Sequence, residues 1–115
     1  MIQIRKCLNS FRFAYNGIKH CARSENNFRV HLLATVAVLL AGFYSKLSEI
    51  EWCMIVLAIG LVLVTEMVNS AIEKLVDLVS SEQNSKAGLV KDMAAGAVLV
   101  AAIAACIIGG IVFVS

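Results

Sequence analysis

The sequence predicts an all-α integral membrane protein, in which an amphipathic N-terminal surface helix precedes three transmembrane helices. Its 115 residues are 60% hydrophobic and 16% charged, whereas soluble domains carry about 25% charged residues. The hydrophobic residues are concentrated in three long segments, 30–44, 52–79 and 93–114, and the chain contains no proline. A soluble helical bundle is disfavoured, because so short a chain has too little polar surface to cover three such helices.

Residues 1–27 have the pattern of a helix that lies in the membrane interface. Apolar residues recur at spacings of three and four, and the basic residues keep to the other side. The apolar positions are Ile4, Leu8, Phe11, Tyr15, Ile18 and Ala22. We expect the cations to face anionic headgroups. A signal peptide is excluded, since basic residues are scattered through the segment and no apolar core follows them.

We expect transmembrane helices at about 28–48, 52–79 and 92–114, within a single domain of residues 1–115. About 20 apolar residues cross the hydrocarbon, so the first segment must include flanking residues or tilt. The third segment carries a small residue at every fourth position, which allows another helix to approach closely. These residues are Ala97, Ala101, Ala105 and Gly109. Three thin spans enclose little of a site, so we expect an oligomer with sites between subunits.

The distribution of basic residues predicts the orientation in the membrane. Most of them precede the first span, Lys74, Lys86 and Lys91 follow near the second connection, and Lys46 alone lies in the first. The positive-inside rule therefore places the N-terminus and the 80–88 loop in the cytoplasm. The net charge of +2 gives no indication of nucleic-acid binding.

The most informative feature is a polar stripe on the second span, formed by Glu66, Asn69, Glu73 and Asp77. These positions fall within roughly 80° of one another on a helix. A helix that simply leaves the bilayer at Glu66 is a poor explanation, because only about fourteen apolar or small residues precede it. Charged residues at membrane depth are usually functional.

Together with Glu25 and the Lys91–Asp92 pair, the stripe supplies the groups of a magnesium and phosphate site. Magnesium takes carboxylate oxygens and shares its other positions with phosphates and water, and lysine supplies a positive charge for phosphate. The chain lacks the phosphate-binding loop of P-loop proteins and the signatures of protein kinases. A nucleotide would have to be held by another architecture.

The stripe lies in the segment EMVNSAIEKLVD, residues 66–77. It resembles the signature of the prokaryotic diacylglycerol kinase family, E-x-[LIVM]-N-[ST]-[SA]-[LIV]-E-x-x-V-D, at every specified position. Lys91-Asp92, followed by residues 94–98, is similar to the family's second characteristic stretch. The resemblance covers nearly the whole chain. It implies a homotrimeric helical bundle in the bacterial cytoplasmic membrane, acting as a lipid kinase that uses ATP and Mg²⁺.

The resemblance also implies residue roles. Glu66 would be the catalytic base that takes the proton of a lipid hydroxyl, and Glu25 and Glu73 would hold the metal. The residues implied to bind ATP and its Mg²⁺ are Glu25, Asn69, Glu73, Asp77, Glu82, Lys91 and Asp92. The chain departs from the family after Glu82, where Gln83 and Asn84 replace an aromatic residue and a histidine.

Two lipid substrates and one different class of protein remain as interpretations. Residues 26–31, which end in His31, and residues 50–52 resemble the undecaprenol kinase branch of the family. This resemblance favours undecaprenol over diacylglycerol as the substrate. A small ion-coupled transporter is the alternative class, because intramembrane acids also serve ion pathways. Such a pathway would need neither the Lys91–Asp92 pair nor a cytoplasmic Glu25. A non-catalytic scaffold leaves the polar stripe unexplained.

Overall fold

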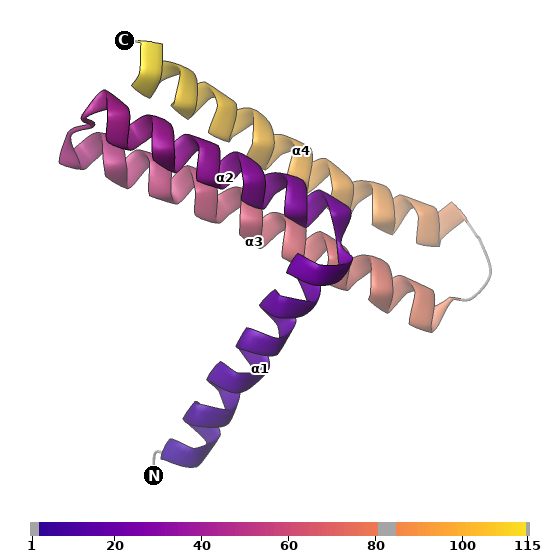
Figure 1. The fold of residues 1–115 in the computed structure, drawn as a ribbon. Coiled ribbons are helices and arrows are strands. Elements are labelled where there is room, and N and C mark those ends of the chain that lie inside the picture. Colours follow the sequence, from indigo (N-terminus) through magenta and orange to yellow (C-terminus); the bar gives the residue numbers. More distant parts are fainter. Residues whose placement is uncertain (1–2, 81–84, 115) are drawn as a thin grey trace.

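The computed structural model describes residues 3–80 and 85–114, and in them it contains four helices. They are α1 (Ile4–Ser24), α2 (Asn26–Ser45), α3 (Glu49–Val79) and α4 (Ser85–Val114). Figure 1 shows α2, α3 and α4 side by side and α1 projecting away from them. Within the described residues, α2, α3 and α4 are long and apolar enough to cross a membrane. The prediction of an all-α protein with three membrane-spanning helices is confirmed by the number, length and apolar character of these helices.

Helix α1 joins the rest of the chain at its C-terminal end. It ends at Ser24, short of the predicted residue 27, because Glu25 adopts an extended conformation with φ −102° and ψ 111°. A new helix begins at Asn26, and the chain turns sharply between the two (Figure 1). Cys21 is the buried residue of α1. The apolar side chains Leu8 and Phe11 remain exposed.

The turn between α2 and α3 has the predicted length but lies earlier in the chain. Helix α2 ends at Ser45, where residue 48 was expected, and Lys46 takes the left-handed conformation with φ 53°. Helix α3 begins at Glu49, before the expected residue 52, because Ser48 and Glu51 form a capping box. The Ser48 hydroxyl accepts from the Glu51 N–H, and the Glu51 carboxylate accepts from the Ser48 N–H. These bonds satisfy amide groups that a helix start otherwise leaves unpaired.

The same end of the bundle is closed by Gly42 and Trp52. A Cβ atom at Gly42 would lie 2.6 Å from Cη2 of Trp52, so only glycine allows this approach of α2 to α3. The Trp52 ring also packs on Phe43 of α2, with ring centroids 5.1 Å apart. Phe28 and Ile55, each 2% exposed, are the most deeply buried large side chains in the described core.

Helix α4 packs mainly against α3 and begins at Ser85, ahead of the expected residue 92. Lys91 and Asp92, expected at the very start of this span, therefore lie about two turns inside the helix. Ala101 of the small-residue face is 3% exposed within this single chain. Part of that face therefore serves the contact of α4 with α3, while Ala97 remains exposed.

Candidate functional site on α3

The polar stripe of α3 passes from the core to the surface of the bundle. Glu66 is 3% exposed, and Asn69 and Ser70 are also buried. Glu73 and Asp77, further along the helix, are exposed. Burial of a carboxylate costs free energy unless a polar partner compensates for the lost water. A polar partner is therefore expected close to the Glu66 carboxylate.

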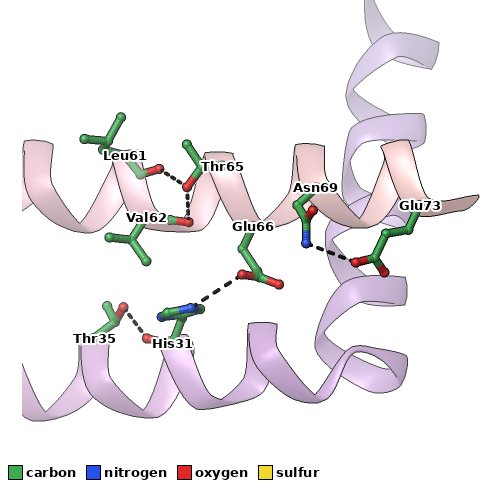
Figure 2. A network of polar contacts seen from close by, with 8 residues as sticks. All are labelled: His31, Thr35, Leu61, Val62, Thr65, Glu66, Asn69 and Glu73. Carbon is green, nitrogen blue, oxygen red and sulfur yellow. Dashed lines mark hydrogen bonds and ion pairs between the residues drawn. The ribbon is translucent and has the colours of Figure 1, made fainter. Parts of the chain in front are cut away.

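The partner of Glu66 is His31 of α2. Nε2 of His31 lies 3.5 Å from Oε2 of Glu66, and Figure 2 shows the two side chains pointing toward one another from facing helices. This distance is longer than that of a well-formed hydrogen bond. Catalytic hydrogen bonds are often long before a substrate binds and shorten in the complex.

Asn69 lies between Glu66 and the exposed end of the stripe. Its Nδ2 donates to Oε1 of Glu73 at 3.4 Å, as Figure 2 shows. Its Oδ1 is buried and has no hydrogen-bond partner among the described residues. An unsatisfied buried acceptor costs about 1–3 kcal/mol. The atom is therefore available to a donor from a bound molecule.

Glu25 reaches the same part of α3 from the break between α1 and α2. Its Oε1 accepts a hydrogen bond from Nζ of Lys74 at 2.6 Å. Lys74 follows Glu73 directly, so the bond brings the two predicted metal ligands to one turn of α3. The thiol of Cys21 lies close by, and its pKa is raised, first by burial and then by the charge of Glu25.

A second ion pair joins α3 to α4. Nζ of Lys91 donates to Oδ1 of Asp77 at 2.7 Å. Asp92 is exposed and forms no ion pair within the described part of the chain. Glu82, the remaining candidate, lies outside the described residues.

The donor chemistry of this region is suitable for magnesium. In the described residues no three His, Cys, Asp or Glu side chains gather as a metal cluster. Magnesium does not require one, because it is usually held by one or two carboxylates together with substrate phosphates. Glu73, Glu25 and the orphan oxygen of Asn69 offer oxygen atoms only, which a hard cation prefers.

Two residues of the site were not predicted from the sequence. His31 was singled out only for the resemblance to the undecaprenol kinase branch, and Lys74 only as a determinant of orientation. Lys74 could have been found as the one cation inside the motif. His31 lies 35 positions before Glu66 in the sequence, and only the packing of α2 on α3 reveals their contact.

An apolar cavity of about 300 Å³ adjoins the buried end of the stripe. It lies between α2, α3 and α4, and its walls include His31, Thr35, Ala58, Val62, Ala105 and Cys106. His31 thus borders the cavity on one side and contacts the carboxylate of Glu66 on the other.

The fold and the site define a class of multi-pass helical membrane protein. In this class one helix carries a buried carboxylate, and acidic residues paired with lysines lie further along the same helix at the surface. Comparison with known proteins specifies it further. The sequence profile of the prokaryotic diacylglycerol kinase family matches residues 12–113. The chain therefore belongs to the prokaryotic diacylglycerol kinase family and is an ATP-dependent lipid kinase.

Individual relatives agree with the family. The chain is 44% identical over 111 residues to the undecaprenol kinase of Bacillus subtilis, covering 96% of this chain and 90% of that protein. It is 42% identical over 104 residues to a diacylglycerol kinase of Synechocystis, covering 90% of this chain and 59% of the relative. The diacylglycerol kinase of Escherichia coli K12 is 30% identical over 95 residues, covering 83% of this chain and 78% of that protein.

Proposed function

We propose that this protein transfers the γ-phosphoryl group of ATP to the hydroxyl of a membrane lipid alcohol, with Glu66 as the catalytic base. The observation that carries the proposal is the buried carboxylate of Glu66, 3% exposed and set between apolar helices beside His31. Carboxylates act as general bases in catalysis, and such a base must lie within hydrogen-bond reach of the proton that it takes. Glu66 lies in the packed part of the bundle, where the hydroxyl of a membrane lipid could meet it.

The proposed reaction forms one bond to phosphorus and breaks another. The lipid oxygen bonds to the γ-phosphorus as its proton passes to Glu66. The bond from the γ-phosphorus to the β–γ bridging oxygen breaks, and its electron pair leaves with ADP. The products are ADP, a lipid phosphate and a proton. Such transfers depend mainly on positioning and on neutralising charge.

Glu73 and Glu25 would hold Mg²⁺ together with the phosphates of ATP. Glu73 is exposed and accepts a hydrogen bond from Asn69, and Glu25 is already held at the same turn by Lys74. When bound, the metal supplies positive charge to the phosphates of the nucleotide. The bond from Lys74 holds Glu25 near this position before a metal binds.

The remaining nucleotide contacts are assigned to the cytoplasmic end of α3 and α4. Lys91, held by Asp77, supplies a positive charge for phosphate. Asp77, Asp92 and Glu82 would complete the nucleotide side, and Asn69 would donate or accept beside the transferred group. The Asp77–Lys91 bond supports this grouping, because it fixes the start of α4 against the end of α3.

We further propose that the chain works as a homotrimer in a bacterial cytoplasmic membrane, with a cytoplasmic N-terminus and α1 lying on the membrane surface as an amphipathic helix. The exposed apolar side chains of α2, α3 and α4 support contact with lipid or with neighbouring subunits. The exposed Arg5, Arg12 and Lys19 of α1 support contact with anionic headgroups.

Undecaprenol is favoured over diacylglycerol as the acceptor. The identity of 44% to an undecaprenol kinase, over 96% of the chain, supports this choice. The identity of 42% to a diacylglycerol kinase keeps diacylglycerol as the second candidate. The motif residues of α3 are common to both branches, so the discriminating contacts must lie elsewhere.

A competition assay tests the proposal. Purified protein receives labelled ATP and Mg²⁺ with a long polyprenol and diacylglycerol at equal mole fraction in the same micelles, and Glu66→Gln serves as the inactive control. We expect a higher kcat/KM for the polyprenol, because specificity is a ratio of transition-state affinities. A preference for diacylglycerol would overturn the choice of lipid. If neither lipid were phosphorylated, the proposed lipid kinase reaction would be wrong.

A further inference from the structure

We propose that His31 is a positioning residue for the reaction, which fixes the carboxylate of Glu66 so that one oxygen faces the lipid hydroxyl. This inference rests on the proposed function, because it concerns the same catalytic base. It rests on the contact between the two side chains, on the burial of Glu66 and on the cavity that His31 borders.

The geometry leaves the two oxygens of Glu66 in different positions. Oε2 lies 3.5 Å from Nε2 of His31, whereas Oε1 has no hydrogen bond or ion pair within the described residues. A glutamate side chain on a helix rotates about several bonds, so an unheld carboxylate would adopt many orientations. An N–H donor on Oε2 would select the orientation in which Oε1 is free to accept a proton.

His31 is itself well placed to hold a constant position. Its side chain is 24% exposed and lies near the start of α2, within the packed part of the bundle. Thr35, one turn further, donates from Oγ1 to the carbonyl oxygen of His31 at 2.7 Å. The imidazole also forms part of the wall between the apolar cavity and the carboxylate. A group in this place can orient the base without touching the phosphates.

The other polar neighbours of Glu66 cannot replace His31. Asn69 lies almost one turn along α3, but its Nδ2 donates to Glu73. Thr65 donates to the backbone carbonyl oxygens of Leu61 and Val62, away from the carboxylate, as Figure 2 shows. Cys21 of α1 is buried near this region, and a thiol is a weak hydrogen-bond donor. Among the described residues, His31 is the side chain with a nitrogen 3.5 Å from the Glu66 carboxylate.

The test compares His31→Leu, which removes the donor, with His31→Gln, which keeps an N–H group at similar reach. Thr65→Val is the matched control, because it also turns a polar residue beside Glu66 into an apolar one, and the Thr65 hydroxyl donates only to backbone carbonyl oxygens of its own helix. All three are assayed with ATP, Mg²⁺ and a long polyprenol in mixed micelles. Size-exclusion chromatography confirms that each variant keeps the assembly of the wild type.

We expect His31→Leu to lower kcat by about 10- to 100-fold, a part of the 10²–10⁴ that a positioned general base contributes. The KM values for lipid and for ATP should stay within about twofold, since the contact acts on the transition state. His31→Gln should recover most of kcat, and Thr65→Val should resemble the wild type.

Three results would overturn the inference. They are a wild-type kcat in His31→Leu, an equal loss in the Gln and Leu variants, or a rise in the lipid KM at unchanged kcat, which would make His31 a substrate contact. An inactive wild-type protein would instead refute the proposed function. The two failures are therefore distinguishable in one experiment.

Discussion

Nζ of Lys74 on α3 donates a hydrogen bond of 2.6 Å to the carboxylate of Glu25, 49 positions earlier in the chain. This bond ties the junction of α1 and α2 to the turn of α3 that carries Glu73. The Lys74 side chain is 55% exposed, and exposed ion pairs contribute only about 0–1 kcal/mol to stability. Its importance is therefore geometric: it brings a second carboxylate to the proposed metal site.

Exchanging the charges of this pair separates its structural role from metal binding. The double variant Glu25→Lys/Lys74→Glu keeps an ion pair at the helix junction but moves the carboxylate to α3. We expect its kinase activity to be lost at every Mg²⁺ concentration, because the proposed ligand at position 25 is gone. Lys74→Gln serves as the control for loss of the pair alone. Wild-type turnover in the double variant would show that Glu25 is only an anchor.

Glu73→Gln should abolish kinase activity and leave the oligomer intact, because the change keeps the shape of the side chain and removes a metal-binding charge. Activity is measured over a Mg²⁺ titration, and assembly by size-exclusion chromatography. Glu49→Gln, the same substitution in the exposed first turn of α3, is the control and should behave as the wild type. Near-normal turnover of Glu73→Gln at limiting Mg²⁺ would contradict the ligand assignment.

Gly42→Ala should destabilise the protein, because the new Cβ atom would lie 2.6 Å from Cη2 of Trp52. Overpacking of this kind costs about 1–3 kcal/mol. The comparison is Gly17→Ala in α1, where no atom lies within 4 Å of an added Cβ, and where alanine favours the helix. Thermal unfolding in detergent should show a lower midpoint for Gly42→Ala only. Equal midpoints would mean that the Trp52 ring moves aside without cost.

Alkylation kinetics test the surroundings of Cys21. Burial, followed by the charge of Glu25, raises the pKa of this thiol, and only the thiolate reacts. In a variant whose other cysteines are serine, the alkylation rate should still rise with pH above the point at which a cysteine peptide levels off. The rate is followed with a maleimide from pH 7 to pH 10. A profile that matches the peptide would show that the thiol is exposed to water.

Much of the fold could be predicted from the sequence, because the length of an apolar segment determines whether it can cross a membrane. The ends of the helices were harder. No glycine or proline marks the break at Glu25, so the first helix was predicted to end at residue 27 and not at Ser24. The charged Lys91 and Asp92 were expected to begin the third span, although α4 already begins at Ser85. Helix α2 ends where Lys46 takes a left-handed conformation that usually favours glycine.

The site was predictable along α3 and less so across helices. Helical periodicity placed Glu66, Asn69, Glu73 and Asp77 on one face, but it could not show that the first two are buried and the last two exposed. Contacts between helices depend on packing, which one sequence does not specify. The Glu66–His31 and Glu25–Lys74 contacts therefore became visible only in the structure.

The burial of Glu66 bears on whether ATP is hydrolysed by water when no lipid is bound. A base that water reached freely would activate water as an acceptor, and ATP would then be hydrolysed without any lipid being modified. With 3% of Glu66 exposed, bulk water has little access to this carboxylate, and its apolar surroundings would admit a long-chain alcohol more readily than water. For the proposed catalytic base, this burial would limit the hydrolysis of ATP in the absence of lipid.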